Sequence, residues 1–313
     1  MLSRIADSLY WLNRYMERAD GMVRLVAIHY SLSLDKDINK NITWKPVLET
    51  FTLLSHDQIQ TQENDTGKVL NKMLVDTTNS NSLKVLVNKA RENARGVQDH
   101  ITKEVWEQVN HMYHLVNNPS LIAKLNSYQG LEVLELFMKQ SLMYAGVIDV
   151  TMSRGLGWQF MNLGKYVERC LQTIVLTEKQ IQVLYQAQEP VNDIFQWRSL
   201  LLSLSGYELH LKTYRSTDHS YNVLHQVILN DNFTRSLHYS LRHIEYCLNY
   251  ITATSTDDQT MDLMRCFGRL YSKIKYMDLN HLEGEVLSPF LEETKFDLLE
   301  FSRRLGQHFF SYS

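Results

Sequence analysis

Two Glu-Arg pairs are the residues of this sequence whose types and spacing could do chemistry. They stand at Glu17-Arg18 and at Glu168-Arg169. Adjacent residues on a helix point about 100° apart, so the two members of a pair do not face each other. A guanidinium among apolar neighbours needs a carboxylate or a carbonyl to accept its hydrogen bonds. Each of these side chains is therefore expected to reach a neighbouring helix, or Glu17 to bond Arg14 one turn back.

A second charged segment could supply partners for these pairs. Arg91 and Arg95 lie one helical turn apart, and Glu92 and Asn93 lie between them. The predicted polar network, with a binding or a structural role, comprises Arg4, Glu17, Arg18, Arg91, Glu92, Asn93, Arg95, Arg154, Glu168 and Arg169.

Three interpretations fit such a network. Buried ion pairs would fix which helices pack in which register and would add little net stability. A pocket of mixed charge would instead bind a carboxylate, a phosphate or a peptide end through bidentate arginines. An enzyme would use Glu17 or Glu168 as an acid or base while the arginines hold an anionic substrate. The first interpretation is favoured, and no catalytic residue is assigned.

Three further residues have the spacing of metal ligands. Glu107, His111 and His114 stand at positions i, i+4 and i+7 of an expected helix, and His and carboxylate groups bind zinc and related metals. The usual outcome for such a trio is a solvated helix face, so no metal is predicted. The Glu-x-x-His, HExxH, GxSxG, Walker A and GxGxxG patterns are absent from the sequence, and no cofactor is expected.

Long helices must position the Glu-Arg pairs. Over the first 32 residues, apolar residues recur at alternating steps of four and three, which is typical of a helix that buries one seam. Arg18 interrupts a second, largely aromatic and apolar row beside that seam. The residues of the first seam are Ile5, Leu9, Leu12, Met16, Ala19, Val23, Val26 and Tyr30.

The same design returns about 151 residues later. The segment 12–18 matches 163–169, and later landmarks keep nearly the same offset. The paired landmarks are Trp44 with Trp197, Asp76 with Asp231, and Ser82 with Ser236. The sequence therefore predicts an all-α, internally duplicated bundle of ten to twelve helices, with repeat units at 1–150 and 151–313 that share one core.

The composition excludes several classes of protein. The 313 residues include only 12 Gly and 4 Pro, which argues against collagen-like and Gly-rich phosphate-binding designs. A net charge of −3 provides no general basic surface for nucleic acid or an anionic membrane. The 3 cysteines form no CxxC pair, which favours reduced thiols in a cytoplasmic protein. No apolar run of about 18 residues is present, so neither export nor membrane spanning is expected.

Several of these stretches together resemble the bacterial Alpha-E family, which is helical and carries Glu-Arg signatures. The resemblance runs in consistent order from residue 1 to about residue 313. Thr234 stands where the family often has proline, and Cys170 stands where the first copy has Ala19. The stretches that carry the resemblance are 1–11, 15–19, 90–95, 104–107, 151–154, 157–158 and 163–169.

The resemblance implies a function through neighbouring proteins. Members similar to this sequence are encoded beside, or fused to, circularly permuted ATP-grasp proteins of the amide-ligase type and transglutaminase-like cysteine peptidases. Because this chain has no nucleotide-binding signature, we expect a non-catalytic helical partner or substrate-binding protein of an ATP-grasp-type peptide or amide-bond modification system. The expected partners are the ligase, the transglutaminase-like peptidase or both, together with a peptide ligand; nucleic acid and membrane are not expected.

Overall fold

The computed structural model describes residues 1–34, 43–125, 129–187, 194–255, 257–279 and 286–310. These residues form fifteen α-helices, one short 3-10 helix and no strand. The prediction of an all-α fold is confirmed, but the predicted number of helices was too low. The added helices are short: α3 (His56–Gln60) and α7 (Pro119–Lys124) have 5 and 6 residues, too few to produce a periodic pattern.

The chain divides into two compact units. The first unit comprises residues 11–153, and the second unit comprises residues 1–10 and 154–313. The predicted repeat units, 1–150 and 151–313, differ from these units mainly in assigning residues 1–10 to the first half. A core shared by both halves stays a prediction.

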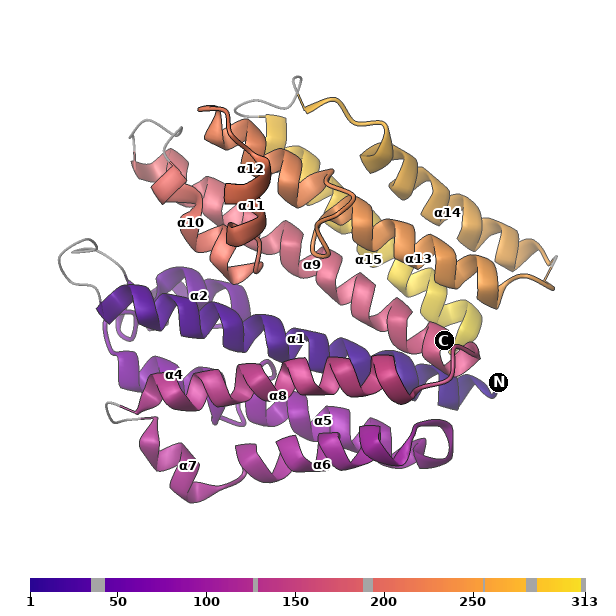
Figure 1. Ribbon diagram of the computed structural model, residues 1–313, viewed down its shortest axis with the longest axis horizontal. Helices are drawn as coiled ribbons and strands as arrows, with labels where there is room; N and C mark the ends of the chain where they lie inside the picture. The colour runs from indigo at the N-terminus through magenta and orange to yellow at the C-terminus, as the bar shows by residue number, and fades with distance from the viewer. Residues whose placement is uncertain (35–42, 126–128, 188–193, 256, 280–285, 311–313) are drawn as a thin grey trace. The chain divides into compact units, whose positions relative to one another are not determined.

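The first unit contains most of α1 (Ser3–Leu34) and the helices up to α8. Helix α6 packs against both α5 and α8 (Figure 1). The Tyr144 hydroxyl on α8 donates to Asn13 Oδ1 on α1 at 2.7 Å. Besides α1, α3 and α7, the elements are α2 (Lys45–Phe51), α4 (Thr66–Leu74), α5 (Leu83–Gly96), η1 (Gln98–His100), α6 (Lys103–Val116) and α8 (Gly130–Thr151).

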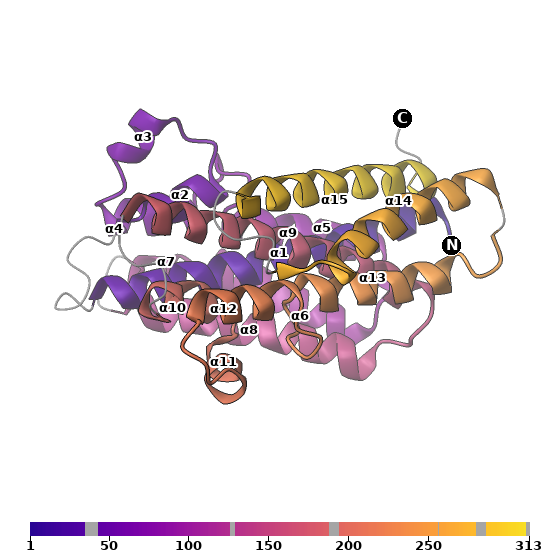
Figure 2. The same ribbon diagram turned by 90° about the horizontal axis from the view of Figure 1, so that it is seen from above.

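The second unit is built on α9 and three further long helices. Helix α9 packs against α13 and α15, and α14 packs against the same two helices (Figures 1 and 2). The helices are α9 (Leu156–Ala187), α10 (Ile194–Ser203), α11 (Tyr207–Thr213), α12 (His219–Ile228), α13 (Leu237–Ile251), α14 (Asp258–Lys275) and α15 (Leu287–Phe309).

The two halves of the chain repeat one order of helices. The first half begins with α1 and the second with α9, each of 32 residues, and they end with α8 and α15, of 22 and 23 residues. The indole nitrogen of Trp44 donates to Thr66 Oγ1 at 3.0 Å, and that of Trp197 donates to Ser220 Oγ at 3.2 Å. An equivalent buried tryptophan therefore hydrogen-bonds to the fourth helix from the second helix, or from the residue before it, in each half, as the predicted duplication requires.

Serine caps begin the equivalent helices α5 and α13. Ser82 Oγ accepts from the backbone N–H of Val85, and Ser236 Oγ accepts from that of Tyr239. Such caps satisfy backbone donors that the first helical turn leaves without partners. The prediction that a serine-capped helix occurs in both halves is thus confirmed.

The pairing of Asp76 with Asp231 needs correction. The backbone N–H of Asp76 donates to Asn71 O and that of Asn230 donates to His225 O, in both cases directly after the fourth helix of the unit. Each of the two side chains also accepts from the backbone N–H two residues later. Asp76 therefore corresponds to Asn230, because the loop geometry and not the residue type sets the alignment.

The described helices include none that is both long enough and apolar enough to cross a membrane.

Replacing each of two glycines by alanine is expected to change the free energy of unfolding in opposite directions. A Cβ on Gly206 would lie 2.6 Å from Gln226 Nε2 and 2.8 Å from Phe233 Cζ, whereas a Cβ on Gly268 within α14 meets nothing within 4 Å. Gly206→Ala should lower the free energy of unfolding by about 1–3 kcal/mol through overpacking. Gly268→Ala should raise it by about 0.5–1 kcal/mol because glycine disfavours a helix interior. Urea unfolding followed by circular dichroism measures both, and equal stability of the two variants would contradict this account.

Candidate functional site

Arg18 holds the turn that precedes α5. Its Nη1 donates to Asn81 Oδ1 at 3.3 Å, and Asn81 directly precedes the capping residue Ser82. The two residues are 63 positions apart in the sequence, so the contact joins α1 to a distant turn. Arg18 also has contacts besides this one.

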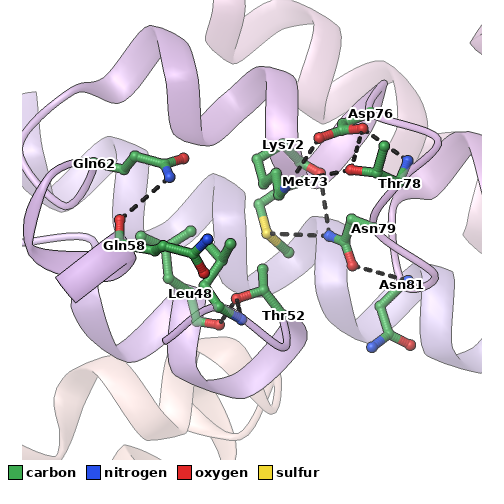
Figure 3. Close-up of polar contacts among 11 residues, drawn as sticks. Leu48, Thr52, Gln58, Gln62, Lys72, Met73, Asp76, Thr78, Asn79 and Asn81 are labelled. Carbon is green, nitrogen blue, oxygen red and sulfur yellow. Dashed lines mark hydrogen bonds and ion pairs between the residues drawn. The ribbon is translucent and has the colours of Figure 1, made fainter. Parts of the chain in front are cut away.

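Side chains within this turn reinforce it, as Figure 3 shows. Asp76 Oδ1 accepts from the backbone N–H of Thr78 at 2.8 Å, and Lys72 Nζ lies 2.7 Å from Asp76 Oδ2. The Lys72 ammonium lowers the pKa of the Asp76 carboxyl, so the carboxylate form that accepts these bonds is favoured. Asn79 is buried and accepts from the backbone N–H of Asn81 at 3.0 Å. The acceptor for Arg18 is thus fixed in place.

Arg169 makes the corresponding contact in the second unit. Its Nη1 donates to the Thr234 carbonyl at 3.1 Å, two residues before the capping residue Ser236. The neighbouring Thr173 Oγ1 donates to the Arg235 carbonyl at 2.8 Å. In both units, therefore, the arginine of a Glu-Arg pair supports the turn before the serine-capped helix.

The two glutamates of the pairs are buried. Glu17 is 9% exposed and Glu168 is 3% exposed. Neither residue is without a partner. Because Glu17 lies in the first unit and Glu168 in the second, the proposal that both pairs belong to one network stays a prediction.

Arg91 has a well-defined setting on the neighbouring helix. Its Nε donates to Asn110 Oδ1 at 2.7 Å, and its guanidinium carbon lies 4.2 Å from the centre of the Tyr113 ring and 5.7 Å from that of Trp106. Cations above aromatic faces are attracted to the ring quadrupole. Arg91 was predicted as a site residue, but its partners on α6 were not, although Trp106, Asn110 and Tyr113 have the i, i+4, i+7 spacing of one helix face.

The other predicted residues lie at the surface. Glu92 is exposed, and its Oε1 lies 3.9 Å from Arg91 Nη1. Arg95 and Arg4 are exposed, and Asn93 Nδ2 donates to the Lys89 carbonyl one turn back. The segment 91–95 therefore presents its charges mostly to solvent. In the second unit, the exposed Arg154 lies 4.7 Å above the Trp158 ring.

The Glu107, His111 and His114 trio is a solvated helix face. All three side chains are exposed, and Glu107 Oε1 lies 3.5 Å from Lys103 Nζ. Within the part of the chain that the structure describes, no three His, Cys, Asp or Glu side chains are placed to hold a metal ion.

A polar cluster at α11 and α12 was not predicted from the sequence. Asn230 Nδ2 donates to the Tyr214 hydroxyl at 2.8 Å, and that hydroxyl lies 2.8 Å from His225 Nδ1. The Tyr214 hydroxyl therefore bridges the Asn230 amide and the His225 ring. Burial lowers the pKa of His225 and raises that of Tyr214, which favours the neutral forms of both. The cluster holds Asn230 at the turn before α13. It could not be predicted because its three residues lie in three different segments and form no sequence motif.

Fold and site together define an all-helical, internally duplicated protein in which arginines of Glu-Arg pairs support equivalent turns. The chain belongs to the Alpha-E family, whose model matches residues 1–310 and is described as a predicted alpha-helical domain with a conserved ER motif. In one-letter code ER is the Glu-Arg dipeptide, which this chain contains at 17–18 and 168–169. No curated protein and no solved structure matches the chain.

Proposed function

We propose that this protein is a non-catalytic helical partner of an ATP-grasp-type amide ligase and binds the ligase through the exposed face of α8. The observation that carries the proposal is the apolar character of that face. Leu142, Met143 and Val150 are 61%, 55% and 84% exposed. Together with Gly146 they follow one another at nearly helical spacing along the second half of α8. Contiguous exposed apolar side chains mark interaction surfaces more often than isolated ones do.

The opposite face of α8 is already used for packing. Tyr144 and Ile148 are buried, and the Tyr144 hydroxyl bonds to α1. A Cβ built on Gly146 would meet no atom within 4 Å, so the exposed face is open in the folded chain. The exposed apolar side chains of α8 are confined to its second half, and the packing of its own unit does not account for them.

The contacts of Arg18 and Arg169 support a scaffold role. Each donates to a turn of its own unit, which positions the helix that follows. In this proposal the Glu-Arg pairs maintain the fold, and the ligase supplies the ATP-dependent step of a peptide or amide-bond modification system.

Co-expression with a circularly permuted ATP-grasp protein of the amide-ligase type tests the proposal. The tagged chain should retain the ligase on an affinity resin, and the purified chain alone should show neither ATPase nor peptidase activity. A double Leu142→Glu, Met143→Glu variant should weaken binding at least ~10-fold, because each buried apolar side chain contributes about 1.5–3 kcal/mol.

A matched control places the same change elsewhere. Phe296 and Leu299 on α15 are also exposed, so the double change of both to Glu alters charge and hydropathy comparably. This control should bind the ligase like the unchanged chain. The proposal fails if the unchanged chain does not associate with the ligase, if both double variants lose binding equally, or if only the transglutaminase-like peptidase is retained. Turnover by the purified chain would instead favour an enzyme.

A further inference from the structure

We infer that Arg91 is the anchor of a binding site for a carboxylate attached to an apolar group, on the surface formed by α5 and α6. This inference does not depend on the proposed docking of a ligase at α8. The site consists of Arg91 on α5 and of Trp106, Asn110 and Tyr113 on α6, all within the first unit.

The guanidinium of Arg91 is held in a fixed orientation. Asn110 Oδ1 accepts from Nε at 2.7 Å. The amide of Asn110 is itself oriented, because its Nδ2 donates to the Trp106 carbonyl at 3.1 Å. The Tyr113 and Trp106 rings lie near the guanidinium carbon, at 4.2 and 5.7 Å from ring centre to carbon. An arginine held in this way loses little further freedom when it binds a ligand.

The outer edge of the same guanidinium remains available. The remaining contact recorded for Arg91 among the described residues is with Glu92 Oε1, 3.9 Å from Nη1 and beyond hydrogen-bond distance. Neither Nη atom is both buried and without a partner, and the side chain is 24% exposed. The N–H groups of both Nη atoms therefore face solvent. Two parallel N–H groups facing solvent match the two oxygens of a carboxylate.

The surroundings favour a carboxylate over a phosphate. Glu92 lies beside the guanidinium, and its charge disfavours a dianion more than a monoanion. Arg95, one turn along α5 and exposed, adds positive charge near the same face. The half-buried rings of Trp106 and Tyr113 offer an apolar surface to the group that carries the carboxylate. The free C-terminus of a peptide that ends in an apolar residue combines these features.

Side-chain NMR can test the site with a defined pair of probes. The probes are N-acetyl-alanyl-leucine with a free carboxylate and the same dipeptide as its C-terminal amide. The carboxylate should shift the Arg91 Nε–H and Trp106 indole N–H signals saturably, and the amide should bind at least ~10-fold more weakly. The two signals are assigned by their loss in Arg91→Lys and Trp106→Phe. Inorganic phosphate, titrated separately, should bind more weakly than the carboxylate.

Two lysine substitutions separate charge from geometry. Arg91→Lys keeps the charge but removes the planar fork, so the carboxylate should bind about 10-fold more weakly, observed at the Trp106 indole. Arg95→Lys, one turn away, should change the affinity less than about twofold. If Arg91→Lys does not fold, Asn110→Ala should weaken binding while the charge remains. The inference is overturned if acid and amide bind equally, if Arg91→Lys or Asn110→Ala binds like the unchanged chain, if no shift saturates, or if phosphate binds as tightly as the carboxylate.

Discussion

Replacing Trp197 by alanine is expected to lower the free energy of unfolding by about 3–5 kcal/mol. Trp197 is 2% exposed and is among the largest fully buried side chains of the described chain. Its loss would leave a cavity between the helices of the second unit and would remove the hydrogen bond from Nε1 to Ser220 Oγ. Urea unfolding followed by circular dichroism and near-ultraviolet absorbance measures the change.

Two further variants separate the cavity from the hydrogen bond. Trp197→Phe keeps most of the apolar volume, so it should cost less than Trp197→Ala. Ser220→Ala removes the hydrogen-bond acceptor while the tryptophan stays in place, and it should cost about 0.5–1.5 kcal/mol. As a control, Tyr276→Ala removes an aromatic ring that is 76% exposed and should change stability by less than about 0.5 kcal/mol. A loss at Trp197→Ala no greater than at Tyr276→Ala would contradict the central role of this tryptophan.

The duplication could be predicted from the sequence because its landmarks are rigid. Trp44 and Trp197 are both buried and donate to equivalent hydroxyls, so neither position accepts a smaller side chain without a cavity. The seam from Ile5 to Tyr30 repeats at the period of a helix, which periodicity detects directly. The alignment failed at Asp76 because the equivalent turn begins with Asn230, and either residue type can accept from the backbone N–H two residues later.

The partners of the arginines could not be predicted in the same way. The sequence does predict that Arg18 and Arg169 contact residues outside their own helices, because both arginines lie in rows of apolar residues. The acceptors, Asn81 Oδ1 and the Thr234 carbonyl, lie 63 and 65 residues away in the sequence. Such contacts depend on how the helices pack, and helix periodicity carries no information about that packing. The same holds for Arg91, whose partner Asn110 is neutral and so gave no charge signal.

A buried histidine is expected to make the first unit sensitive to acid. His29 on α1 is 9% exposed, and its ring centre lies 4.6 Å from that of Trp44. Burial lowers the pKa of His29 from 6.5 to about 4, and a hydrogen bond with the Thr43 backbone only partly offsets this effect. Within the described chain its Nε2 is a buried atom with no hydrogen-bond partner, so the folded protein disfavours the charged ring.

The sign of the effect follows from proton uptake by the unfolded chain. Well above pH 6.5 the ring is neutral in both states, and His29 adds no pH dependence. Between pH 6.5 and about 4 the unfolded chain binds a proton that the folded chain excludes, so the free energy of unfolding falls as the pH is lowered. Each pKa unit is worth about 1.4 kcal/mol, so the total loss is about 3 kcal/mol and ends below the folded pKa.

Urea unfolding at a series of pH values across this window isolates the contribution of His29. His29→Phe keeps a planar ring but cannot take up a proton, so this variant should lose about 3 kcal/mol less stability on acidification than the unchanged chain. Burial also lowers the pKa of His243 to about 4, so part of the acid sensitivity persists in His29→Phe. The exposed His111, changed to Phe, serves as the control and should leave the acid sensitivity intact. If His29→Phe and His111→Phe lose stability in parallel as the pH falls, the His29 ring does not set the acid response, and His243 or the carboxylates must do so instead.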